Sequence, residues 1–108
     1  MKYWLSMTLI ALTLGLIAAR PGDPGPGKAV YTKSCASFHG SAGEGKDAIA
    51  KVFKVEMRHL GSTEAQEKSD EKLRKDTVEG IGKMKPVKGL SEENLDDLIA
   101  YLRTMAKE

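Results

Sequence analysis

The apolar residues of this 108-residue chain recur at the spacing of an amphipathic helix most clearly near its C-terminus. Ser91 is a favourable N-cap, acidic residues follow it in the first turn, and Arg103 and Lys107 fall in the last turns. Between them runs one apolar stripe, formed by Leu95, Leu98, Ile99, Leu102 and Met105. This pattern predicts a helix that starts at Ser91 and covers most of the remaining chain.

Three earlier segments also have helical patterns. The first approaches Cys35, and its inner face consists of Gly27, Val30, Tyr31 and Ser34. The second spans residues 46–57 and is expected to turn four apolar side chains inward: Ile49, Val52, Phe53 and Met57. The third opens at the N-cap Ser69 and runs to Gly80. No segment alternates with period two, so the sequence predicts an all-α fold of about four helices without a sheet.

The N-terminus has the organisation of an export signal. Lys2 precedes an uncharged, largely apolar stretch over residues 4–19, which ends in the small residues Ala18 and Ala19. This stretch is shorter than the ~20 apolar residues that a membrane-spanning helix needs. We therefore predict a cleaved signal peptide over residues 1–19 and export to the periplasm. The alternative is a membrane anchor retained at residues 4–19.

Residues 20–27 combine three prolines with three glycines. Proline and glycine both disfavour regular structure, so this segment is predicted to be a linker that forms neither helix nor strand. A single domain is then expected over residues 28–108.

The charge balance excludes some functions. The chain has 17 basic and 15 acidic residues, a formal net charge of +2, which is too balanced to predict nucleic-acid binding. Its single cysteine rules out an internal disulfide. A small exported domain without a disulfide usually needs another staple, such as a metal or a cofactor. A bound cofactor would supply the apolar core that the short chain lacks.

The candidate chemistry begins at Cys35. The spacing C-x-x-C-H marks covalent haem attachment, in which two cysteines bond to the haem vinyl groups and the histidine ligates the iron. Here Cys35 and His39 occupy the first cysteine position and the histidine position, but Phe38 occupies the second cysteine position. Taken alone, Cys35 would be a buried or free thiol and His39 an ordinary polar histidine.

A second iron ligand would have to come from elsewhere in the chain. Met84 lies in a glycine-rich loop that precedes the C-terminal helix, and Pro86 stiffens this loop. A thioether suits haem iron, and together with histidine it raises the reduction potential. Alone, Met84 could also be a surface or core methionine. The other histidine of the chain, His59, is expected to be exposed and not to act as a ligand.

These residues, together with the terminal helices, closely resemble a class I monohaem cytochrome c from Gly27 onward. The resemblance implies an all-α fold around one haem, with the N-terminal and C-terminal helices crossing. It also implies that His39 is the proximal iron ligand, Met84 the distal one, and Cys35 the haem-bonding thiol. The chain departs from the family at Phe38, and no proline between Pro26 and Pro86 can supply a carbonyl partner for the histidine.

The resemblance implies a monomeric, non-enzymatic electron carrier with one haem c, attached by a single thioether or held non-covalently if attachment fails. Acidic redox partners would meet the haem edge near Lys83, Lys85 and Lys88; alternatively, these lysines form only a solvated loop. If Met84 is displaced from the iron, the protein would be a ligand sensor or weak peroxidase. The other alternative is a haem-free interaction domain on the same scaffold.

Overall fold

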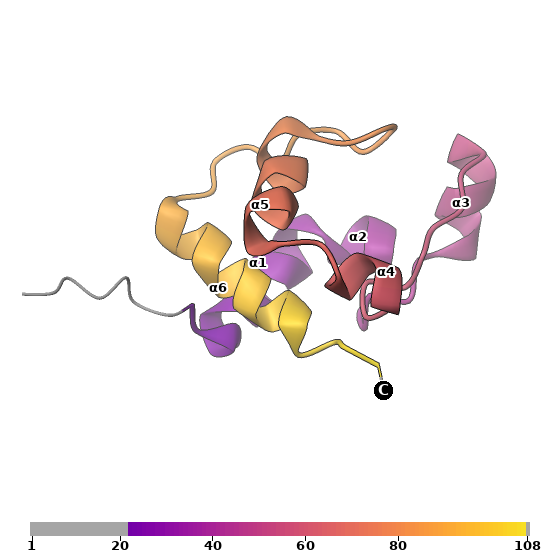
Figure 1. The fold of residues 1–108 in the computed structure, drawn as a ribbon. Coiled ribbons are helices and arrows are strands. Elements are labelled where there is room, and N and C mark those ends of the chain that lie inside the picture. The colour runs from indigo at the N-terminus through magenta and orange to yellow at the C-terminus, as the bar shows by residue number, and fades with distance from the viewer. Residues whose placement is uncertain (1–21, 108) are drawn as a thin grey trace, which may run out of the picture.

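The computed structural model describes residues 22–107, and the regular structure of this part of the chain is helical (Figure 1). The helices are α1 (Pro24–Ser34), α2 (Ala36–His39), α3 (Asp47–Phe53), α4 (Thr63–Gln66), α5 (Asp70–Glu79) and α6 (Glu92–Arg103). Between residues 22 and 107 there is no strand beyond one isolated bridge, from Ile81 to Met84. The all-α prediction is confirmed. The one-turn helices α2 and α4 add to the four that the sequence patterns predict.

Helices α1 and α6 cross in close contact, which we call the clamp (Figure 1). The contact is close because α1 presents Gly27: a Cβ atom at this position would lie 1.9 Å from the carbonyl oxygen of Asp97. Beside the crossing, Tyr31 and Leu98 are each only 1% exposed. The predicted crossing of the N-terminal and C-terminal helices is confirmed.

Helix α1 begins earlier than the sequence predicts. It starts at Pro24, so the prediction that residues 20–27 form no helix is wrong for residues 24–27. Proline is well suited to the first turn of a helix, where its missing N–H is not needed. Asp23 is the N-cap and accepts a hydrogen bond from the Gly25 N–H. The Asp23 N–H in turn donates to the buried Asp97 carboxylate of α6 over 2.7 Å, which fixes the start of α1 to the clamp.

Helix α3 is shorter than predicted. It ends at Phe53 because Lys54 adopts a left-handed conformation with φ of 53°. Val52 is 74% exposed, so its prediction as an inward-facing residue is wrong. In this two-turn helix only one edge, with Ile49 and Phe53, lines the cavity described below.

The predicted caps of the last two helices are confirmed. The Ser69 side chain accepts from the Lys72 N–H at the start of α5, and Ser91 forms a capping box with Asn94 at the start of α6. Arg74 of α5 pairs with Asp96 of α6, which connects the two helices. These contacts hold together the two helices that flank the loop containing Met84.

None of the helices within residues 22–107 is long and apolar enough to cross a membrane. The predicted signal peptide over residues 1–19, and the alternative anchor over residues 4–19, lie outside the described residues.

Candidate functional site

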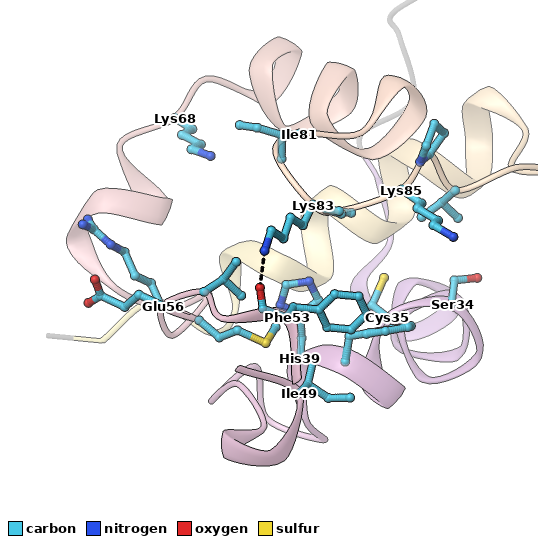
Figure 2. Close-up of a pocket in the computed structure, with 17 residues that line it drawn as sticks. Ser34, Cys35, His39, Ile49, Phe53, Glu56, Lys68, Ile81, Lys83 and Lys85 are labelled. Atoms are coloured by element: carbon cyan, nitrogen blue, oxygen red, sulfur yellow. Dashed lines mark hydrogen bonds between the residues drawn. The ribbon is translucent and has the colours of Figure 1, made fainter. Parts of the chain in front are cut away.

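A cavity of about 700 Å³ opens between α2, α3 and the loop that follows α5 (Figure 2). Its volume lies within the ~300–1,000 Å³ that is usual for cofactor and small-molecule sites. Its walls are mostly apolar, and the side chains with candidate chemistry that line it are those of Cys35, Phe38, His39, Met57 and Met84. The structure therefore brings together the three predicted site residues Cys35, His39 and Met84.

His39 is the last residue of α2 and is held by its backbone, since its N–H donates to the Cys35 carbonyl over 3.0 Å. The hydroxyl of Tyr31 donates to the carbonyl of the next residue, Gly40. Burial lowers the pKa of His39, so the imidazole is neutral at pH 7 and carries a free lone pair. Its Nδ1 atom is buried and has no hydrogen-bond partner among the described residues. No backbone carbonyl within residues 22–107 therefore accepts a hydrogen bond from this nitrogen.

Cys35 lies between α1 and α2, one helical turn before His39, and both residues line the cavity. Its side chain is buried beside Tyr31 and Leu98 of the clamp. Burial raises the pKa of the Cys35 thiol to about 11, so it is protonated at neutral pH. Cys35 therefore connects the clamp directly to the cavity.

Met84 lies on the loop between α5 and α6 and is half-buried. Two backbone hydrogen bonds with Ile81, of 3.1 and 2.9 Å, close this loop into a tight turn. Gly80 permits the turn, because it has φ of 81° and a Cβ atom there would lie 2.5 Å from the Met84 carbonyl oxygen. Lys83 and Lys85, which flank Met84, lie across the cavity from His39 (Figure 2).

Phe38 lies at the edge of the cavity and is 48% exposed. Its ring contacts that of Phe53, with a centroid separation of 6.2 Å and an interplanar angle of 53°. Lys83 reaches over the cavity and donates a hydrogen bond to the Phe53 carbonyl (Figure 2). Lys83 and Lys85 line the cavity, whereas Lys88 does not.

Some residues of the cavity were missed by sequence reasoning. Met57 lines it from the segment after α3, although that methionine was expected to face inward only as part of a longer helix. Arg58 and Lys68 also line it, and the sequence did not predict this, because charged side chains are not expected in the wall of a mostly apolar cavity. His59 does not line the cavity, as expected. It is half-buried rather than exposed, and its Nδ1 atom accepts the Gly61 N–H over 2.8 Å.

The donor set of the cavity suits a haem better than a free metal ion. Among the described residues, no group of three or more His, Cys, Asp or Glu side chains could hold a metal ion. The cavity instead offers one neutral imidazole, two thioethers, one thiol and the single carboxylate of Glu56, in mainly apolar walls. Histidine and methionine are established haem-iron ligands, and within the described residues the Nδ1 atom of His39 has no hydrogen-bond partner.

Comparisons with known proteins agree with this geometry. Residues 25–106 match the family model described as cytochrome c. Cytochrome c-554(547) of Halothiobacillus neapolitanus is 35% identical over 92 residues, which cover 78% of this chain and 98% of the relative. The solved structure of the KustC0563 c-type cytochrome superposes with a TM-score of 0.65 at 27% identity, covering 75% of this chain and 98% of that one. The chain belongs to the cytochrome c family, as a c-type cytochrome of class I.

Proposed function

We propose that this protein is an exported electron carrier whose haem is bonded to Cys35 by one thioether and ligated by His39 and Met84. The observation that carries the proposal is that these three side chains line one mainly apolar cavity of about 700 Å³. Bound there, a haem supplies one-electron chemistry through Fe(II)/Fe(III) cycling.

The ligand roles follow from the state of each side chain. His39 is kept neutral by burial, so one imidazole nitrogen can donate its lone pair without first losing a proton. Met84 is half-buried on a tight turn, so its thioether can be presented from a fixed backbone. If both axial positions are occupied, no position remains for a substrate, which favours electron transfer over catalysis.

The attachment follows from the cysteine count. Cys35 is the only cysteine of the chain, and Phe38 stands where the second haem-bonding cysteine of the motif would be. One thioether is therefore the most that this chain can form. If that bond does not form, His39, Met84 and the apolar walls would hold the haem without a covalent link.

The proposed partners are acidic redox proteins that approach the cavity edge at Lys83 and Lys85, with Lys88 nearby. Lys83 and Lys85 line the cavity, are exposed and would give this edge a positive charge. Such charges steer association, and their effect weakens as salt screens them. Export to the periplasm and action as a monomer complete the proposal.

Two methionines line the cavity, which provides a matched test of the ligand assignment. The oxidised wild-type protein should give a low-spin spectrum with a methionine–iron charge-transfer band. Met84→Ala should abolish this band, whereas Met57→Ala should keep it. Loss of the band in Met57→Ala alone would overturn the assignment of Met84.

The same spectra separate the alternatives. High-spin iron in the wild type that readily binds carbon monoxide when reduced would favour the ligand sensor or weak peroxidase. A colourless, cooperatively folded protein from haem-replete cells would favour a haem-free interaction domain and overturn the proposed function.

A further inference from the structure

We infer that Phe38 is a positioning residue that closes the cavity by packing where a second thioether would have closed it by a bond. Its partner is Phe53 at the end of α3, and Lys83 connects Phe53 to the loop that carries Met84. We call these two links, the Phe38–Phe53 ring contact and the Lys83–Phe53 hydrogen bond, the aromatic clasp. The inference rests on the proposed function, because the cavity is taken to hold the haem.

The first link is the ring contact. The centroid separation of 6.2 Å and the tilted rings fall within the favourable range for aromatic pairs, ~4.5–7 Å. Both side chains line the cavity, yet Phe38 is 48% and Phe53 36% exposed. The rings are therefore available both to each other and to a flat apolar group in the cavity.

The second link is the hydrogen bond from the Lys83 ammonium to the Phe53 carbonyl. Phe53 is the last residue of α3, and the final carbonyls of a helix lack partners within the helix. A lysine is well suited to bind such a carbonyl. Because Lys83 directly precedes Met84, this bond connects α3 to the backbone of the proposed iron ligand.

The clasp matters because α3 has little other support. Within the described residues, α3 forms no extensive contact with another helix, unlike α1, α5 and α6. The ring contact joins it to α2, which carries His39, and the lysine joins it to the opposite wall. Removal of the Phe38 ring should therefore loosen α3 and the Met84 loop together, without disturbing the clamp.

Hydrogen exchange measured by mass spectrometry on the haem-loaded full chain tests this inference. Phe38→Ala and Phe53→Ala should each speed exchange in peptides covering residues 47–57 and 81–87, by about 2- to 12-fold. Exchange in the double variant should be only slightly faster than in the faster of the two single variants, since both changes break the same contact. Peptides from α1 and α6 should be unchanged, and Phe38→Tyr, which keeps the ring, should behave like the wild type.

Two further variants make the test specific. Val52→Ala removes another exposed apolar side chain of α3, one that does not line the cavity, and should leave exchange unchanged. Phe38→Cys restores the C-x-x-C-H motif but removes the ring. It should add a second haem bond while exchange in residues 47–57 still rises, as in Phe38→Ala.

Wild-type exchange rates in Phe38→Ala would overturn the inference, and so would faster exchange that appears equally in α1 and α6. Failure of the proposed function has a different signature, namely a wild-type protein that carries no haem. A haem-loaded protein in which Phe38→Ala has no effect would refute the aromatic clasp and leave the carrier function standing.

Discussion

The clamp and the cavity wall of this small domain are built by opposite means. In the clamp, Gly27 lets two helix backbones meet, and Tyr31 and Leu98 are fully buried beside them. In the wall, one-turn and two-turn helices present half-exposed aromatic rings at Phe38 and Phe53. The polypeptide completes the clamp by itself, whereas the wall leaves apolar surface for something else to cover. Stability should therefore depend on the first region and cofactor retention on the second.

The two regions meet at a few defined contacts. The hydroxyl of Tyr31, in the clamp, donates a hydrogen bond to the carbonyl of Gly40, the residue directly after His39. Lys68 lines the cavity while its ammonium pairs with the buried Asp76 of α5 over 3.1 Å. Substitutions at these contacts, and within the clamp, can test how separate the two regions are.

The largest effect is expected for Gly27→Ala. The new methyl group would lie 1.9 Å from the Asp97 carbonyl oxygen, so α1 and α6 would have to move apart. We expect a loss of about 3 kcal/mol in the free energy of unfolding, measured by urea denaturation. Gly25→Ala, on the same helix, is the control, because its nearest contact is a side-chain oxygen of Asp23 at 3.2 Å rather than a backbone atom of another helix. Equal stability of the two variants would show that the clamp does not depend on close backbone contact.

A smaller effect is expected for Tyr31→Phe, which keeps the ring but removes one of the two donors to the Gly40 carbonyl; the other is the Gly43 N–H at 3.3 Å. The loss of this buried hydrogen bond should lower the free energy of unfolding by about 1 kcal/mol. Because Gly40 follows His39, the variant should also bind added imidazole faster when oxidised. Tyr101→Phe is the control, since the Tyr101 hydroxyl donates no hydrogen bond within residues 22–107. Unchanged imidazole binding in Tyr31→Phe would mean that the clamp and the haem site are independent.

The smallest effect is expected from the pH dependence at Asp76. Burial alone would raise the pKa of this carboxyl, but hydrogen bonds from Lys72 and Lys68 outweigh it and lower the pKa below its ordinary value of 3.8. The folded state therefore binds this proton less readily than the unfolded state. Its stabilising contribution is present above about pH 4 and is lost as the pH falls through the folded-state pKa.

Asp76→Asn should accordingly lower stability at pH 6 and flatten the fall in urea midpoint between pH 6 and pH 3. Asp47→Asn, which changes an exposed side chain, controls for net charge. An unchanged pH profile in Asp76→Asn would contradict the stabilising role of the ion pairs that Lys68 and Lys72 form with Asp76.

The clamp could be predicted from the sequence because its signals are local. The stripe from Leu95 to Met105 and the Ser91 cap predict α6, and the spacing of Gly27 and Tyr31 predicts the face of α1 that meets it. The start of α1 could not be predicted from proline content alone, because Pro24 acts as the first helical residue only when Asp23 caps it.

The cavity wall was predicted only in part. The motif around Cys35 and the glycine loop around Met84 predicted residues that line one cavity, because their chemistry is tied to short-range spacing. The positions of Met57 and Arg58 follow from where α3 ends, which is at the left-handed Lys54. Lys68 lines the cavity from the short connection between α4 and α5. Val52 shows the same limit: apolar spacing does not reveal how short a helix is.

The intact mass of the denatured protein after haem extraction shows whether the site is c-type with a single thioether. We expect a polypeptide heavier by one haem, and we expect Cys35→Ala to yield the bare polypeptide mass with haem in the organic phase. A wild-type protein at the bare polypeptide mass, with all of its haem extracted, would contradict the proposed thioether.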